Sequence, residues 1–468
     1  MSFFAGVNST GSAVETQALE KALSAGYGTD STTFINGRAM IPEDLEATTI
    51  SVTSMMENDC KMFNSLKKEP AHSTIHEYNR RTSHGDHRFL SVPEGGASGE
   101  TDQALSRAFV EMKYLQTLRQ VTKQMEAVKT FDGALASEKI AGIQTIVKGA
   151  EHQIFHGDST VVPTEFDGLL AILDRENSRA VKKDLRGKSL GSVGEALFDE
   201  VAQNVFDIDN NGELTKALFP PVLAADIKGL FTDRLRMMMN DNMLSFKGLP
   251  PYGTAIGHDI RFSGKDAGAD KYFHVKGKVV AAGDPTKRPA APTAFAAAPT
   301  QDTANSKFVT EDAGTYNYTV HAVNAFGISE GKALNAGVAT VSAGDKVTLT
   351  ITPAGTGNAA TGYIICRSKK NGTETMEMVQ IGAKAGAPTE YVDLNKDLPG
   401  TASMLFLSDG MYGSPTMQFD QLLPVQSIPM YPTNQAVTPF LIVLYGALQV
   451  NAPEHCALVK NIQYRGGF

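Results

Sequence analysis

The sequence predicts an α+β protein with an all-β domain inserted into it, and three observations carry this prediction. Two alternating segments flank a polar, glycine-rich tip in residues 66–125. One helical stripe follows over residues 137–156. Near Pro285 the composition changes to short β-rich runs separated by turn residues, and longer apolar segments resume after residue 404. An island of one structural class within another is typical of a domain inserted in a loop of its host.

Size and composition limit the classes of protein that remain. A chain of 468 residues implies roughly two or three domains. A net charge of −8 argues against a general nucleic-acid binder, whose surface is normally basic. The three cysteines are far apart in the sequence and predict no disulfide framework. The N-terminus lacks a secretory pattern, and the longest apolar run, Phe440 to Leu448, is far too short to span a bilayer. We therefore expect a soluble protein made inside a cell.

The elements before the island can be justified in order. Residues 1–40 mix Gly, Ser and Thr and predict an extended arm. Residues 66–115 alternate on both sides of the polar tip and predict a long β-hairpin, which has too little apolar surface to be stable alone. In residues 137–156 apolar side chains recur at helical spacing, with Ser137 as the expected N-cap and Gly157 beyond the end. Further short helices are expected in "EFDGLLAILD" and "GEALFDEVAQNVF", and "TKALFPPVLAADIKGLF" predicts a strand, a turn and a helix.

The island itself begins with a stretch rich in Pro and Ala. "GDPTKRPAAPTAFAAAPTQ" is interpreted as a linker, and the β-rich runs beyond it are spaced as in a small sandwich of about a hundred residues. The predicted boundaries of this sandwich are residues 290–400.

One acidic run imitates a calcium loop. Asp207, Asp209, Asn211 and Gly212 match its first half, but the position that needs a bidentate Glu is Leu218, and two prolines follow. A turn that ends a helix is therefore preferred over a calcium site.

Other short motifs are weak as well. Gly187-Lys188-Ser189 resembles the end of a phosphate loop, but Lys182 stands where the first glycine should be. The Gly-x-Ser-x-Gly matches at Ser189 and Ser329 lack the strand-to-helix context of a nucleophile. Four histidines gather in the hairpin, and a metal site there is the less favoured alternative to pairing with acidic neighbours; they are His72, His76, His84 and His87. We expect no catalytic, cofactor-binding or metal site and no cofactor.

Several sequence blocks resemble the major capsid proteins of tailed bacteriophages, in particular those of large phages with contractile tails. They include "AGYGTD", "KKEPAHSTIHEYNRR", "HGDHRF", "VEMKYL", "FHGDS", "EFDGLLAILD" and "LIVLYGALQVNAPEHCALVKNIQYRGGF". Within the island, "YNYTVHAVNAFGISEG" is similar to the penultimate strands of fibronectin type III modules, a class of immunoglobulin-like sandwich.

The resemblance implies the Hong Kong ninety-seven fold. Its parts map onto this chain as follows: an N-terminal arm at 1–40, a peripheral domain at 41–189 with an extended loop at 66–115 and a spine helix at 137–156, an axial domain at 190–285 and 404–468, and the inserted sandwich at 290–400. The implied function is a structural one: the chain assembles into pentamers and hexamers of an icosahedral head shell that encloses double-stranded DNA without reading its sequence.

The implied partners are other copies of the chain, with scaffolding, portal and decoration proteins as further candidates and no membrane. The implied location is the virion, assembled in the cytoplasm of the host bacterium. Basic residues of the hairpin are the hypothesised contacts to a neighbouring subunit: Arg80, Arg81, His84, His87 and Arg88. The competing classes are another virion component, such as a tail protein or adhesin, and a secreted enzyme with a fibronectin-type accessory module. The absence of Trp, which sugar-binding enzymes commonly use for stacking, argues against that enzyme.

Overall fold

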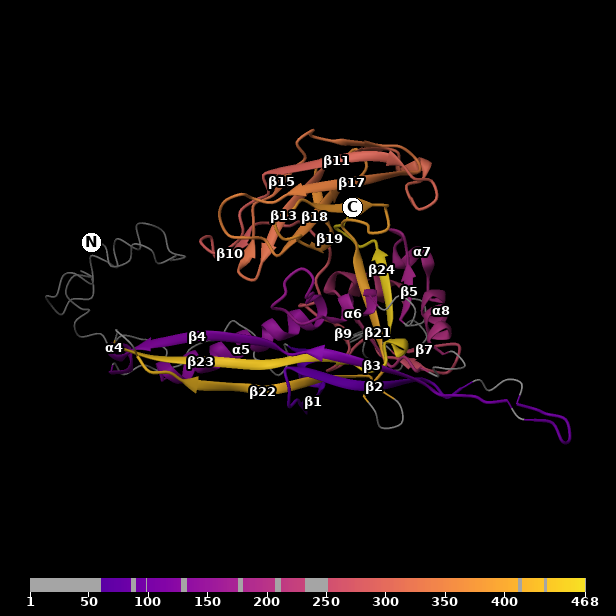
Figure 1. Cartoon of the computed structure of the whole chain (residues 1–468), viewed down its shortest axis with the longest axis horizontal. Helices are drawn as coiled ribbons and strands as arrows, with labels where there is room; N and C mark the ends of the chain where they lie inside the picture. Colours follow the sequence, from indigo (N-terminus) through magenta and orange to yellow (C-terminus); the bar gives the residue numbers. More distant parts are fainter. Residues whose placement is uncertain are drawn as a thin grey trace, which may run out of the picture.

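The chain folds into two β-sheet bodies, a β-sandwich and a projecting hairpin (Figure 1). The computed structural model describes residues 60–85, 90–97, 99–127, 133–175, 180–206, 212–231, 251–410, 415–432 and 436–467. The predicted N-terminal arm lies outside these residues, as do residues 207–211 of the predicted turn, His87 and Arg88.

The first body is a long four-stranded sheet covered by one helix. Its strand order is β1 (Lys67–Pro70), β22 (Met417–Pro429), β23 (Val437–Val450) and β4 (Lys113–Thr122). The helix α5 (Ala134–His156) lies along one face of this sheet (Figure 1). Gly142 allows the close approach, because a Cβ there would stand 2.3 Å from Cδ1 of Ile442 in β23. The run Phe440–Leu448 is thus the middle of a central strand, which explains its nearly continuous apolar character.

The start of this helix differs from the prediction. α5 begins at Ala134, with Gly133 at the N-cap position, and Ser137 lies inside the first turn, where its amide donates to the carbonyl of Gly133. The expected cap fails because Ala134, Leu135 and Ala136 are good helix formers that extend the helix past the serine. The C-terminal prediction is correct, since Gly157 follows the last helical residue. Two short helices flank the body: α3 (Lys61–Ser65) and α4 (Lys123–Ala127).

The second body is a mixed five-stranded sheet. Its order is β5 (Val181–Asp184), β24 (Ala457–Ile462), β21 (Ala402–Leu407), β6 (Lys216–Phe219) and β9 (Gly268–Ala269). The predicted short helices are present as α6 (Leu169–Arg175), α8 (Ala196–Val205) and α9 (Ala224–Leu230), the last after a 3₁₀ turn at Pro221–Leu223. Phenylalanines form much of the core around the second sheet, including Phe198, Phe219 and Phe406. The minor elements of this region are α7 (Leu190–Val193), β7 (Tyr252–Gly253) and β8 (Asp259–Ile260).

The island folds as two facing antiparallel sheets. One has the order β10 (Ala282–Gly283), β14 (Gly327–Ile328), β13 (Tyr318–Asn324), β18 (Gly362–Ser368) and β19 (Thr375–Gly382), with β15 (Lys332–Ala333) also on β13. The other has the order β11 (Ala294–Gln301), β17 (Asp345–Thr352) and β20 (Thr389–Asp393). A short pair, β12 (Gly314–Tyr316) and β16 (Ala339–Val341), and a 3₁₀ turn at Thr310–Asp312 complete it. Side chains from both sheets share one apolar core, as a sandwich requires.

The linker prediction is wrong for half of its stretch. Residues 294–301 form β11, which pairs with β17 along its whole length. Pro299 is compatible with this strand because β11 lies at the edge of its sheet, where one side needs no amide donor. Phe295 is fully buried and anchors the strand in the sandwich core. The alanine-rich composition concealed a strand because small side chains suffice on its exposed outer face.

The sandwich is packed directly on the loop that follows α5. Val161 and Val162 of that loop form an apolar cluster with Val323, Ile364 and Cys366 of the sandwich. The sandwich therefore stands above α5 in contact with the first body (Figure 1).

We expect Gly382→Ala to destabilise this junction. A Cβ at residue 382 would stand 2.2 Å from the carbonyl oxygen of Thr160, so backbone would have to move. Overpacking of this kind costs about 1–3 kcal/mol, and calorimetry of the full chain measures it. Gly355→Ala is the matched control in the sandwich, because a Cβ there meets nothing within 4 Å. Equal unfolding temperatures for the two variants would contradict the close contact.

Among the described residues no helix combines the length and the apolar character that crossing a membrane requires.

Candidate assembly surface

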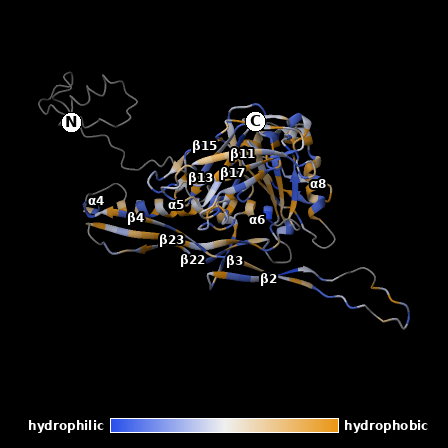
Figure 2. Ribbon diagram, turned by 45° about the horizontal axis from the view of Figure 1, so that its top comes forward, coloured by the Kyte–Doolittle hydropathy of each residue, from blue (hydrophilic) through white to orange (hydrophobic). Residues whose placement is uncertain are grey.

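A two-stranded hairpin projects from the body (Figures 1 and 2). It consists of β2 (Ile75–Ser83) and β3 (Ala104–Glu111), paired antiparallel from Ile75 opposite Glu111 outwards. The second alternating arm of the sequence continues beyond it but is divided at Met112, which is buried. The residues after Met112 form β4 and leave the hairpin for the four-stranded sheet.

One face of the hairpin is tied to its own subunit. The Tyr78 hydroxyl donates to the carbonyl oxygen of Val450 at 3.2 Å. Nη2 of Arg80 donates to the same carbonyl at 2.7 Å and to the Tyr78 hydroxyl at 2.6 Å. The Arg80 guanidinium also lies 5.1 Å from the centre of the Tyr78 ring, a cation–π arrangement. These contacts fix the base of the hairpin against the end of β23.

The opposite face of the hairpin carries apolar side chains in solvent. Ile75 is 50% exposed, Leu105 60% and Phe109 72%. Between them Arg107 forms an ion pair with Glu77 across the strands. We call this face, made of Ile75, Glu77, Leu105, Arg107 and Phe109, the outer row. A monomer gains nothing from exposing it, and exposed apolar patches rimmed by polar groups mark interaction sites.

A second exposed apolar surface lies on the four-stranded sheet, on the face away from α5. Leu118 is 60% exposed and stands beside Leu441 and Ile428 in neighbouring strands. Tyr114, 52% exposed, meets Tyr445 edge to face with ring centres 4.8 Å apart. At the end of β22, Tyr431 is 93% exposed. The hairpin and the sheet thus both offer apolar contact area.

A groove of about 390 Å³ lies at the base of the hairpin. Its lining joins apolar side chains such as Phe109, Phe166 and Val450 to the basic groups of Arg107 and Arg175. Arg175 is held by carboxylates of the loop after α5, at 2.7 Å in the case of Asp167. The groove is a recess between hairpin and body, and its charged groups include the ion pairs of Arg107 with Glu77 and of Lys113 with Glu111.

The five basic residues predicted as contacts fall into three groups. Arg80 faces its own subunit and holds the hairpin base. Arg81 is exposed and stands opposite Leu105, on the same face as the outer row. His84 is exposed just beyond the end of β2. His87 and Arg88 lie outside the described residues, so their role remains a prediction.

Sequence reasoning missed the apolar part of this surface. "ALSRAFVEM" places apolar residues on both faces of β3, so the alternation alone does not say which face is buried. The sequence feature that could have indicated it is the long polar tip. A hairpin with such a tip is expected to extend beyond the body, so that one of its faces stays uncovered.

In the described part of the chain no group of three or more His, Cys, Asp or Glu side chains is arranged so that it could hold a metal ion. Of the hairpin histidines, His76 lies 4.0 Å from a carboxylate oxygen of Asp420.

Three other histidines are gathered at the end of α5, where the rings of His152, His156 and His274 lie 5.4–5.8 Å apart. Nε2 of His156 accepts the backbone amide of His274 at 2.9 Å, so that nitrogen is already occupied. Burial, with repulsion between the imidazoles, lowers the pKa of His152 to about 4 and that of His156 to about 3.

The serine motifs are structural. Ser189 precedes the four-residue helix α7, after a turn in which Arg186 and Gly187 have positive φ. Ser329 is buried between β14 and β15, where its hydroxyl accepts the amide of Ala322 and donates to the carbonyl of Glu330. Ser189 lies five residues after the edge strand β5 and is followed by a helix of only four residues, and Ser329 is followed by another strand.

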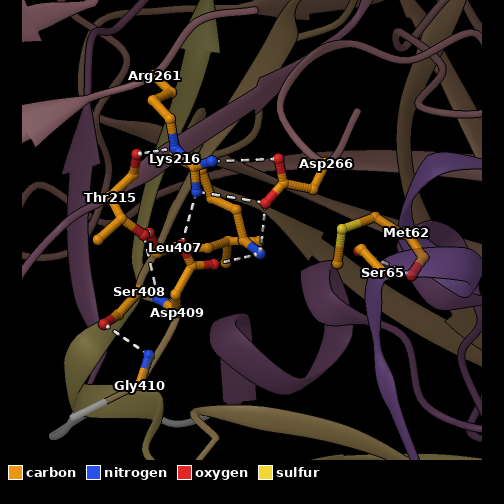
Figure 3. A network of polar contacts seen from close by, with 10 residues as sticks. All are labelled: Met62, Ser65, Thr215, Lys216, Arg261, Asp266, Leu407, Ser408, Asp409 and Gly410. Atoms are coloured by element: carbon orange, nitrogen blue, oxygen red, sulfur yellow. Dashed lines mark hydrogen bonds and ion pairs between the residues drawn. The ribbon is translucent and has the colours of Figure 1, made fainter. Parts of the chain in front are cut away.

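A cluster of charges in the second body is also structural (Figure 3). Nζ of Lys216 lies 2.7 Å from Asp409 and 3.7 Å from Asp266, and Arg261 lies 2.6 Å and 3.3 Å from the same two carboxylates. Burial alone would raise the pKa of Asp409, but hydrogen bonding and ion pairing with Lys216 outweigh it and lower the pKa. Two cations balance two anions, which joins the ends of β6 and β21.

These features define a class of protein: a structural subunit whose uncovered surface is a projecting hairpin and the sheet at its base. Comparison with models of protein families gives no match. The chain is 26% identical over 468 residues to a protein of Enterococcus phage phiEF24C that is provisionally named a major capsid protein, with 95% of this chain and 94% of that protein covered. It is 23% identical over 461 residues to the major capsid protein of Staphylococcus phage K, with the same coverage of both chains.

Over nearly its whole length the chain is similar to proteins named as major capsid proteins of phages. Among solved structures, it is similar to a chain of Microbacterium phage Oxtober96, with 7% identity, a TM-score of 0.47 and coverage of 92% of this chain and 99% of that one. The capsid of a native GTA particle gives 7% identity and a TM-score of 0.44, with 93% and 100% covered. Because these identities and TM-scores are low, the similarity to capsid proteins rests on the sequence relatives.

Proposed function

We propose that this chain builds the icosahedral head shell of a phage by assembling into pentamers and hexamers around double-stranded DNA. The observation that carries the proposal is the outer row on a two-stranded hairpin. Three large apolar side chains are at least half exposed on an element that is too thin to bury them itself. A second copy of the chain provides a cover at every position of a closed shell.

Burial of these exposed apolar side chains between subunits would provide the free energy of assembly. Complete burial of one large apolar side chain gains about 1.5–3 kcal/mol. The outer row and the exposed residues of β4 together offer several such side chains per subunit. Interfaces between permanent partners commonly exceed about 2,000 Å² and are reduced in strength by the entropy of ordering. A closed shell repeats the modest gain at every subunit.

The test is direct imaging of the purified chain. We expect hollow shells, or pentamers and hexamers, in negative-stain electron microscopy and as early peaks in size-exclusion chromatography. A chain that stays monomeric at high concentration, with a folded far-UV spectrum, would contradict the proposal.

Charge reversal at Arg81 provides a second prediction. We expect Arg81→Glu to weaken assembly by about 0.2–1 kcal/mol per contact, because exposed ion pairs are worth little and are screened by salt. The midpoint concentration of assembly, measured by light scattering at low and high salt, checks this. Arg80 is unsuitable for the same test because its reversal would break the hairpin base within one subunit. An effect of Arg81→Glu that does not decrease with added salt would argue against pairing with an acidic neighbour.

The remaining expectations form part of the proposal. The shell would be assembled in the host cytoplasm, with scaffolding, portal and decoration proteins as partners. The island would be an immunoglobulin-like module of the fibronectin type III kind, supported by its two facing antiparallel sheets. The alternatives of another virion component or a secreted enzyme are not favoured, since the named relatives are described as major capsid proteins.

A further inference from the structure

The strand β4 forms one edge of the four-stranded sheet, beside β23, and no further described strand pairs with it (Figure 1). It runs for ten residues opposite β23 without a register shift. The other edge of the sheet, β1, is four residues long and ends at Pro70. Long, regular edges present unpaired backbone groups to other chains, and natural proteins commonly shorten them or interrupt them with a proline or a bulge. β4 has none of these protections.

The direction of the β4 backbone groups follows from the hydrogen bonds at the two ends of the strand. Just after β4, the amide of Lys123 donates to the carbonyl of Ala436, on the side of β23, at 2.9 Å. Just before β4, the amide of Met112 donates to the carbonyl of Thr74, at the start of the hairpin, at 2.8 Å. Successive residues of an antiparallel strand point their backbone groups to alternate sides. The odd-numbered residues of β4 therefore bond to β23, and the even-numbered ones point away from the sheet. The outward residues are Tyr114, Gln116, Leu118, Gln120 and Thr122, and all of them are exposed.

The outward residues form a self-complementary set. Leu118 is the middle one, so an antiparallel second copy of β4 centred there pairs every outward residue. Tyr114 then stands opposite Thr122, Gln116 opposite Gln120, and Leu118 opposite itself. Each of these pairs can exchange two backbone hydrogen bonds, as directly opposed residues do in antiparallel sheets.

The face of β4 toward α5 fits the same pairing. Leu115 meets Val121 of the second copy, so that apolar side chains lie opposite each other, and Arg119 meets Thr117 rather than another cation. Any other centre leaves at least one outward residue unpaired. A centre at Arg119 would also place two guanidinium groups opposite each other.

Lysines meet at the two ends of this pairing. Lys113 of one copy comes opposite Lys123 of the other, but each lysine already has a carboxylate partner. Glu111 lies 2.6 Å from Lys113, and Glu126 lies 2.8 Å from Lys123. The ends therefore add little repulsion.

We propose that two copies of this chain join at β4, edge to edge and antiparallel, across a twofold axis at Leu118. The two four-stranded sheets then form one continuous sheet, with both α5 helices on the same face. Such an interface is isologous, because the same surface of each copy contacts its counterpart. The inference rests on the proposed function only in taking a second copy of the chain as the partner. It adds a contact that does not involve the outer row of the hairpin.

Disulfide trapping in the full-length chain tests the pairing. At the twofold axis the two Cα atoms of residue 118 would lie about 5.5 Å apart, within the range that a disulfide bridges. We expect Leu118→Cys to give a covalent dimer under mild oxidation, measured on non-reducing gels. The background is low because the natural cysteines, Cys60, Cys366 and Cys456, are all buried.

Tyr114→Cys is the matched control for Leu118→Cys. Tyr114 is exposed on the same face of the same strand, but in the proposed pairing it would lie about 27 Å from its counterpart. We expect it to give at least about tenfold less dimer than Leu118→Cys. Tyr114→Cys combined with Thr122→Cys should restore the dimer, since these two positions are opposite each other. Equal amounts of dimer from the two single variants, or no dimer from Leu118→Cys, overturn the proposal.

Proline substitutions test whether the contact uses the backbone. Gln116→Pro, combined with Leu118→Cys, removes an outward amide and should reduce the dimer about tenfold while the Tm stays nearly unchanged. Thr117→Pro is the matched control, because it removes an amide that bonds to β23 and should lower the Tm of the subunit. An undiminished dimer with Gln116→Pro would exclude strand pairing. An equal loss of Tm in the two proline variants would show that the amide directions are wrong, which also overturns the proposal.

Failure of this contact and failure of the proposed function are distinguishable. Shells in electron microscopy without the Leu118→Cys dimer exclude the β4 contact and leave shell formation intact. The dimer without shells supports the β4 contact and counts against shell formation.

Discussion

Replacement of Leu105 and Phe109 together by aspartate is expected to abolish shell formation while the subunit stays folded. Both side chains are more than half exposed in the outer row, so the subunit loses little core. In a shell each would be covered by a neighbour, and loss of that burial removes roughly 3–6 kcal/mol per subunit before the cost of burying the new charges. The concentration needed for assembly should rise on the order of a hundredfold or more. Electron microscopy shows whether shells form, and light scattering measures the concentration needed for assembly.

Asn79→Asp is the control for this variant. Asn79 lies on the same face of β2, opposite Arg107, so the substitution adds a carboxylate without removing apolar area. We expect it to assemble nearly normally. If the double variant forms shells at the natural concentration, the outer row does not contribute to the interface, and the exposed face of β4 becomes the better candidate.

The second large effect is expected inside the sandwich, at Arg367. This arginine is 2% exposed and donates to Asp393 at 2.6 Å and to Asn395 at 2.7 Å. The Tyr318 hydroxyl donates to the same Asp393 oxygen at 2.9 Å. Arg367→Met should destabilise the sandwich by about 3–5 kcal/mol, because it leaves the Asp393 charge buried without its cation. Calorimetry of the full chain should show the transition of the sandwich shifted to lower temperature.

A double variant tests the reason for that loss. Arg367→Met with Asp393→Leu removes both charges, and we expect it to recover a large part of the stability of the single variant. If the double variant is as unstable as the sum of the two single ones, packing around the guanidinium, with Phe308 and Tyr316 near it, is the larger contribution.

The sequence was sufficient for elements whose signal is local. The hairpin arms, the spine helix and the small helices at "EFDGLLAILD" and "GEALFDEVAQNVF" follow from alternation or helical spacing and are present in the structure. Two local details were wrong. Ser137 is a plausible cap by type, but helix-forming residues precede it, and β11 is hidden by Ala and Pro because a partner strand 50 residues away provides its hydrogen bonds. Pairing between strands that are distant in the sequence depends on tertiary structure, and local composition does not predict it.

The sequence predicted which element carries the candidate surface, but it did not predict which side chains are exposed there. The resemblance and the polar tip predicted the hairpin, and the contacts predicted on it were its basic residues. The structure turns Arg80 inwards and leaves Leu105 and Phe109 outside. In a two-stranded element every residue alternates between two faces, and only the docking of its base decides which face is free.

The positions of β23 and β24 affect how such a subunit is made. β23 lies between β22 and β4, and β24 lies between β5 and β21, so each sheet stays open until a late strand arrives. On the ribosome, neither body can close before residues 437–462 have been synthesised. A copy whose translation stops before residue 437 lacks an interior strand in both bodies and cannot complete either sheet.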